Sequence, residues 1–132
     1  MSPLLSVRNL GVRHAREGGT TEALSGISFD LALGERLAVI GESGSGKSTL
    51  ALALGGLLPS GSTVSGTISW PALGSQARNG QDVGFVFQDP SGSLDPLMRV
   101  GDQIAEVLHA CRDMRKSEAR AQAVNLIRQV AL

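Results

Sequence analysis

Alternating hydrophobic and polar positions predict two strands near the start of the chain. Over residues 4–12 the alternation is broken, which predicts a strand with an irregularity near Asn9 and Leu10. Over residues 24–33 it is regular and predicts a strand with one wet face. Between them, Glu17-Gly18-Gly19-Thr20 predicts a loop.

Short continuous apolar runs predict strands that are covered on both faces. Two such runs are Leu37–Ile40, directly before a glycine-rich loop, and Val83–Phe87. A further strand is predicted over Val64–Trp70, followed by a polar connection over residues 71–82.

Helical periodicity replaces alternation in three places. Residues 47–58 are rich in Ala and Leu and contain no Pro, which predicts a helix. Two more helices are predicted near the C-terminus, the second with Ser117 as its N-cap, and they could pack as a hairpin. Their apolar stripes are Ile104, Val107, Leu108 and Cys111, then Ala123, Leu126, Ile127 and Val130, still running as the chain reaches Leu132.

Composition narrows the function classes. Twelve basic residues balance twelve acidic ones, and aromatic residues make up 3%, with no Tyr, which argues against a nucleic-acid partner. Cys111 is the sole cysteine, so no internal disulfide can form, and we interpret it as core packing. No leader-like or membrane-spanning stretch is found, so we expect a soluble, cytoplasmic chain.

The glycine-rich loop carries the chemistry. Gly41-x4-Gly46-Lys47-Ser48 fits the phosphate-loop pattern, with an apolar run before it and a helical segment after it. We expect backbone N–H groups and the helix N-terminus to bind nucleotide phosphates, Lys47 to neutralise the β and γ phosphates and Ser48 to bind Mg²⁺. The nucleotide-binding residues expected here are Gly41, Glu42, Ser43, Gly44, Ser45, Gly46, Lys47, Ser48 and Thr49.

A second metal ligand is expected just after the predicted strand at residues 83–87. The amide of Gln88 offers both a donor and an acceptor, so it could bind Mg²⁺ and orient a water. Alternatively, Asp89 holds the magnesium as the acidic residue of a Walker B strand. In that case the chain is a self-contained nucleotide-binding protein, such as a switch or a small-molecule kinase.

Together, the phosphate loop and Phe87-Gln88-Asp89-Pro90 resemble the ATP-binding cassette (ABC) ATPases of membrane transporters. The runs 85–96 and 100–106 are most similar to subunits of dipeptide, oligopeptide and nickel importers. The resemblance implies an α/β P-loop cassette fold, truncated here. An antiparallel β subdomain and a RecA-like core would occupy residues 1–95, and the start of a helical subdomain residues 96–132.

By the same resemblance, Lys47 and Gln88 are catalytic residues, with Gln88 in the Q-loop, and His14 takes the place of the ring that stacks on adenine. His14 could equally be an ordinary exposed loop histidine, and we interpret His109 as structural.

The family's signature motif, Walker B Asp with its catalytic Glu, and switch His are not found in the 132 residues. We therefore expect the N-terminal part of a longer domain, one that binds Mg·ATP weakly without turning it over. The implied partners are transmembrane permease subunits, a second ATPase domain and, indirectly, an extracytoplasmic solute-binding protein. The implied location is the inner face of the cell membrane, and the transported solute cannot be read from these residues.

Overall fold

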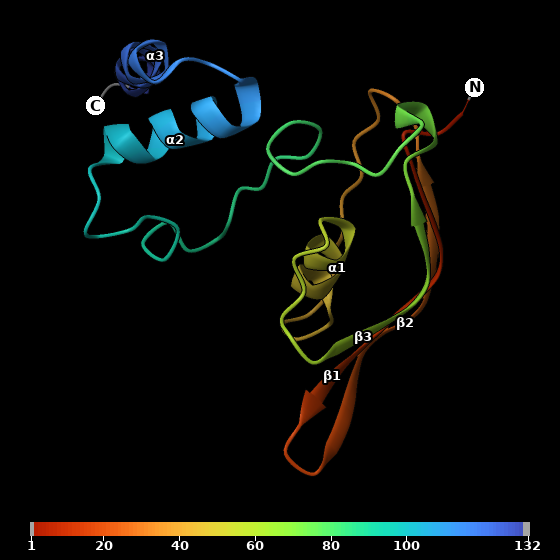
Figure 1. Ribbon diagram of the computed structural model, residues 1–132. Helices are drawn as coiled ribbons and strands as arrows, with labels where there is room; N and C mark the ends of the chain where they lie inside the picture. The colour runs from red at the N-terminus through yellow and green to blue at the C-terminus, as the bar shows by residue number, and fades with distance from the viewer. Residues whose placement is uncertain (1, 131–132) are drawn as a thin grey trace. The chain divides into compact units, whose positions relative to one another are not determined.

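Figure 1 shows the computed structural model, which describes residues 2–130. The chain divides into two compact units, residues 1–77 and residues 78–132. The first contains strands β1 (Leu5–Arg16) and β2 (Gly19–Leu31), helix α1 (Lys47–Leu54), strand β3 (Ser62–Ser69) and the short 3-10 helix η1 (Pro71–Leu73). The second contains helices α2 (Val100–Arg112) and α3 (Lys116–Gln129).

The three strands form one antiparallel sheet in the order β2-β1-β3. In the central strand β1, Leu5, Val7, Leu10 and Val12 are buried, which confirms the broken alternation of the sequence. The break is a register shift after Val7 that includes Asn9, whose φ is +48°. The irregularity near Asn9 and Leu10 is confirmed, and this bulge returns the apolar side chains of β1 to the same face of the sheet.

Helix α1 covers that face (Figure 1). Its buried Leu50 and Ala53 join the core side chains of β1 and β2. The helix was predicted to reach Leu58 but ends at Leu54, because Gly56 takes φ +63° and its N–H bonds to the Ala53 carbonyl. The N–H of Leu57 bonds to the carbonyl of Leu52, which completes a Schellman ending.

Two predicted strands do not form within the described residues 2–130. Leu37–Ile40 and Val83–Phe87 pair with no neighbouring strand, apart from an isolated bridge at Val83. Instead of being covered, Ile40 is 91% exposed and Val86 fully exposed. A buried strand needs neighbours on both edges to bind its N–H and C=O groups, and the described part of the chain supplies none to these segments.

The two helices of the second unit pack as the predicted hairpin, with Ala105, Ala119 and Ala123 buried between them. The expected N-cap at Ser117 is wrong. Helix α3 begins at Lys116, because the carbonyl of Arg115 already accepts the first helical hydrogen bond, from Ala119. The predicted continuation of the α3 stripe to Leu132 lies outside the described residues.

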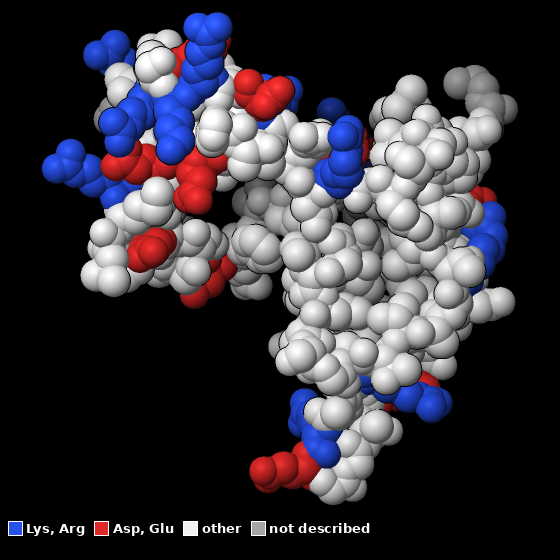
Figure 2. Space-filling model, in the orientation of Figure 1, with Lys and Arg blue, Asp and Glu red and all other residues white. Residues whose placement is uncertain are grey.

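Figure 2 shows that Lys, Arg, Asp and Glu side chains gather over α2 and α3 on the face in view. One pair, Arg120 with Asp102, joins the two helices at 3.2 Å. Among residues 2–130, no helix has the length and apolar character needed to cross a membrane.

Candidate phosphate-binding site

The glycine-rich loop at residues 41–46 leads directly into α1. Two of its glycines, Gly44 and Gly46, have φ values of +80° and +92°, in the region that L side chains rarely adopt. The N–H of Ser45 bonds to the carbonyl of Glu42 at 3.2 Å, which closes a tight turn within the loop. The backbone therefore has the compact curvature that the sequence pattern predicted.

The N-terminus of α1 is open to an anion. Its N-cap is Gly46, which has no side chain to bond the first N–H groups, and the first turn contains no acidic residue. The free N–H groups of Lys47, Ser48 and Thr49 and the positive end of the helix dipole thus meet no negative charge from the helix itself. This is the arrangement that binds phosphate at helix N-termini.

The ammonium of Lys47 lies over the loop. Its Nζ donates to the carbonyl oxygens of Gly41 at 2.8 Å and Glu42 at 2.6 Å, and to the Oγ of Ser45 at 3.3 Å. These three acceptors match the three hydrogens of an ammonium group. A phosphate oxygen can join the ammonium by replacing the longest of these bonds, the one to Ser45.

The loop rests on strand β2. A Cβ at position 46 would lie 2.6 Å from the carbonyl oxygen of Ala23 and 2.8 Å from Cδ2 of Leu24. Leu24 is itself buried in the sheet core. Glycine is therefore required at position 46 for two reasons, its positive φ and its close approach to β2, and the sheet determines where α1 begins.

His14 and the phosphate loop line one pocket of about 270 Å³. The expected site residues in its wall are His14, Gly44, Gly46, Lys47, Ser48 and Thr49. Two of them, Lys47 and His14, are 33 positions apart in the chain, and the antiparallel sheet brings them together. His14 is therefore not an ordinary exposed loop histidine but a residue of strand β1 at the wall of this pocket, and its stacking role stays a prediction.

Several further residues of this wall were not predicted from the sequence. Arg16, Thr21, Glu22 and Ala23 also line the pocket, and all four come from the β1–β2 hairpin. The register of the hairpin could have indicated these residues, because it pairs His14 with Thr21 and Arg13 with Glu22. The two-residue connection at positions 17–18 determines that register, but the pattern of residues 4–12 did not show that β1 extends to Arg16.

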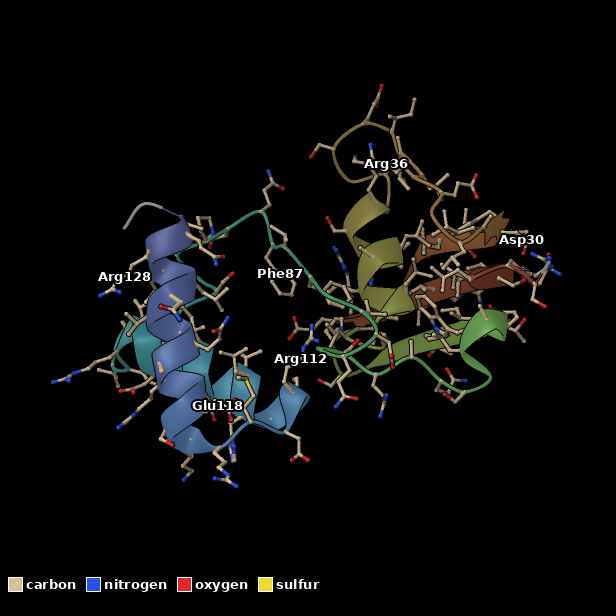
Figure 3. The ribbon with its side chains drawn as sticks, turned by 90° about the horizontal axis from the view of Figure 1, so that it is seen from above. Asp30, Arg36, Phe87, Arg112, Glu118 and Arg128 are labelled. Atoms are coloured by element: carbon tan, nitrogen blue, oxygen red, sulfur yellow. The ribbon has the colours of Figure 1, made fainter. Side chains whose placement is uncertain are left out.

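Gln88 and Asp89 belong to the second unit. Gln88 is exposed and lies in no helix or strand, directly after Phe87, which Figure 3 shows on the extended segment before α2. One carboxylate oxygen of Asp89 accepts the N–H of Ser91 at 3.0 Å, so this side chain stabilises its own turn. Both interpretations of this region assumed a strand over 83–87 that is not formed, and the metal-binding role of Gln88 stays a prediction.

His109 and Cys111 have structural surroundings. The Nδ1 of His109 donates to the carbonyl of Met114 at 2.6 Å, across the turn between α2 and α3, which agrees with the structural role expected of it. Cys111 is partly exposed rather than fully buried, and its Sγ lies against Gly80.

The chain matches the family described as ABC transporter over residues 24–132, and it belongs to this family. The match includes the phosphate loop, α1 and the whole second unit. The α/β organisation of sheet, loop and helices is consistent with part of an ABC ATPase cassette, the fold class that the sequence predicted.

Curated relatives match along the whole chain. It is 37% identical to the dipeptide transport ATP-binding protein DppD of Bacillus subtilis, over 100% of this chain and 42% of that protein. It is 40% identical to the oligopeptide transport ATP-binding protein OppD of Mycobacterium tuberculosis, over 100% of this chain and 23% of that protein. With OppD of Escherichia coli the identity is 36%, over 98% of this chain and 41% of the relative. The chain thus spans less than half the length of these relatives.

Proposed function

We propose that this chain is the nucleotide-binding part of the ATP-binding subunit of an ABC importer for peptides. The observation that carries the proposal is the uncapped N-terminus of α1, preceded by a loop that the ammonium of Lys47 bonds, with Lys47 and His14 lining one pocket. The names of the relatives support peptides as the cargo. Nickel is a second candidate cargo, carried only by the resemblance of the sequence.

ATP is the proposed ligand, and its triphosphate fits the donors of the loop. The free N–H groups at the start of α1 would bind the phosphate oxygens, and Lys47 would neutralise the β and γ phosphates. The imidazole of His14, in the same pocket wall, would stack on the adenine. The carboxylate of Glu22 also lines the pocket, but it is paired with Arg13 at 3.3 Å.

Magnesium is the proposed cofactor. The exposed hydroxyl of Ser48 lines the pocket and is a hard oxygen ligand of the kind that Mg²⁺ prefers. Within residues 2–130, no group of three or more His, Cys, Asp or Glu side chains is placed to hold a metal ion. In nucleotide sites, Mg²⁺ commonly binds to substrate phosphates and only a few protein oxygens. When bound, the ion would neutralise charge that develops on the phosphates.

Hydrolysis also needs a group that aligns the attacking water. We propose that Gln88 senses whether a γ-phosphate is bound. We expect the general base to come from outside residues 1–132, since the family's Walker B glutamate is not among them. These residues alone should therefore bind Mg·ATP without rapid turnover. Permease subunits, a second ATPase domain and, through the permease, a solute-binding protein are the proposed partners, which would hold the chain at the inner face of the membrane.

Titration calorimetry with Mg·ATP tests the nucleotide site. The chain has only two lysines, so Lys47→Ala has a matched control in Lys116→Ala, at the start of α3. Hydrogen bonds to charged groups contribute about 1.5–3 kcal/mol, so Lys47→Ala should weaken binding roughly tenfold to a hundredfold. Lys116→Ala should bind as the wild type does. Equal affinity for wild type and Lys47→Ala would contradict the site.

Uptake measurements test the cargo. In a host strain that carries Lys47→Ala in the encoding gene, uptake of labelled dipeptides and oligopeptides should fall to the level of a gene deletion. Uptake of labelled Ni²⁺ in the same strains separates the two candidate cargoes. Normal peptide uptake with impaired nickel uptake would replace the peptide assignment by nickel, and normal uptake of both would refute the transport role.

A further inference from the structure

Ser62 lies directly opposite His14 in the sheet. The register pairs His14 of β1 with Ser62, the first residue of β3. Ser62 also ends a tight turn, because its N–H bonds to the carbonyl of Pro59 at 3.2 Å. The turn is tied to β1 by a hydrogen bond from the N–H of Ala15 to the carbonyl of Gly61 at 3.1 Å. Two backbone hydrogen bonds thus hold the segment that carries the Ser62 hydroxyl beside the imidazole.

The hydrogen-bond directions at Ser62 select the tautomer of the neutral His14 ring. The Oγ of Ser62 lies 2.7 Å from the carbonyl oxygen of Pro59 and 2.9 Å from Nδ1 of His14. A carbonyl can only accept, so the single hydroxyl hydrogen goes to Pro59. Nδ1 must then be the donor to Ser62, and the neutral ring has its proton on Nδ1 and a bare Nε2.

The same bond restricts the ring plane. The χ2 torsion of histidine is broad and roughly two-fold, so an unbound ring would sample several orientations and both tautomers. The chain of hydrogen bonds from Pro59 through Ser62 selects one of them. His14 is held in this way at the wall of the phosphate pocket. Within residues 2–130, Nδ1 is the ring nitrogen of His14 for which a hydrogen bond is found.

We propose that Ser62 is a positioning residue for nucleoside binding, which orients the His14 ring for stacking on the base. The proposal rests on the proposed function, because it assigns Ser62 to the same nucleotide site. Stacking uses the face of a ring that every base has, so the contribution does not depend on the identity of the base. It also does not reach the phosphates, which the loop binds.

Titration of the full chain with Mg·ATP, Mg·GTP and magnesium tripolyphosphate tests this role. Fixing one side chain in advance saves about 0.5–1.5 kcal/mol on binding, so Ser62→Ala should weaken ATP and GTP roughly two- to tenfold. Tripolyphosphate affinity should not change. Ser62→Thr retains the hydroxyl on a residue that favours strands and should restore wild-type affinity. In a His14→Ala background, Ser62→Ala should have no further effect.

Nitrogen-15 NMR of the imidazole supplies a measurement that needs no nucleotide. In the neutral imidazole, the wild type and Ser62→Thr should show a proton on Nδ1 and none on Nε2, and Ser62→Ala should show a mixture of tautomers. A wild-type ring protonated on Nε2 would overturn the inference, as would Ser62→Ala weakening tripolyphosphate as much as ATP.

Failure of the nucleotide site and failure of the role of Ser62 give different titration results. If the nucleotide site itself is wrong, no triphosphate, including tripolyphosphate, will show binding that depends on Lys47. If only the role of Ser62 is wrong, binding will depend on Lys47 while Ser62→Ala binds ATP as tightly as the wild type.

Discussion

Replacing Gly46 by alanine tests the coupling between the sheet and the phosphate loop. At φ +92° an alanine is in the left-handed region, which costs about 1–2 kcal/mol. Its Cβ would also lie 2.6 Å from the Ala23 carbonyl oxygen and 2.8 Å from Cδ2 of Leu24. Neither atom can move freely, because the first is backbone in β2 and the second is core, and overpacking of this kind costs about 1–3 kcal/mol more.

Gly44 is the matched control. Its φ of +80° carries the same left-handed cost, but a Cβ there would meet no atom within 4 Å. We therefore expect Gly44→Ala to destabilise the protein by about 1–2 kcal/mol and Gly46→Ala by about 2–5 kcal/mol. The difference measures the contact between loop and sheet. The whole cost expected for Gly46→Ala is a substantial part of the roughly 5–15 kcal/mol that stabilises a typical domain.

Urea denaturation gives the two stabilities, and titration with magnesium tripolyphosphate under native conditions gives the effect on the site. Gly46→Ala should bind tripolyphosphate more weakly than Gly44→Ala, because the start of α1 must move away from β2. Equal destabilisation by the two substitutions would refute the claim that β2 positions the loop. Unchanged phosphate binding in a destabilised Gly46→Ala protein would refute the claim that this position matters for the ligand.

Three further predictions concern stability. Leu10→Ala, at a fully buried position, should cost about 2–5 kcal/mol in urea denaturation, whereas Leu33→Ala, at a position 72% exposed, should cost under about 0.5 kcal/mol. Ala119→Leu should overpack the hairpin of α2 and α3 and lower the free energy of unfolding by about 1–3 kcal/mol, whereas Ala121→Leu, on the exposed face, should change it little. Equal losses of stability would contradict the assigned interface. A hydrogen bond from Arg8 lowers the pKa of Asp30. The pair therefore stabilises the fold at pH values above the ordinary carboxyl pKa, and this stabilisation is lost as the pH falls through the lowered pKa. The midpoint of urea denaturation should therefore fall less on acidification in Asp30→Asn than in the wild type. The same dependence of the midpoint on pH in both proteins would contradict this.

Local patterns predicted the elements whose stability comes from nearby residues. The broken alternation of β1 located the bulge at Asn9, and the glycine-rich loop with the helix after it was predicted from spacing alone. Helix α1 ends before the predicted Leu58 because Gly55 and Gly56 form a helix stop. A Schellman ending depends on local backbone bonds, so this stop is present in the sequence itself.

The two missing strands have a different explanation. Leu37–Ile40 and Val83–Phe87 have the composition of buried strands, yet the first has an exposed Ile40 and the second an exposed Val86. Hydrophobic runs indicate that a segment can be buried, but a strand exists only when other strands pair with it. That pairing depends on residues distant in the chain, which no local pattern contains.

For the candidate site, residue types and spacing predict a phosphate loop with Lys47 and Ser48 as ligands, because the pattern has glycines, a lysine and a hydroxyl in a fixed order. The binding roles of these two residues stay predictions. Only the tertiary structure placed His14 in the same pocket, set Ser62 beside its Nδ1 and rested Gly46 on Ala23. Those contacts follow from strand register and from the packing of α1 on the sheet. Both are long-range properties that arise when separate segments bury their apolar faces together.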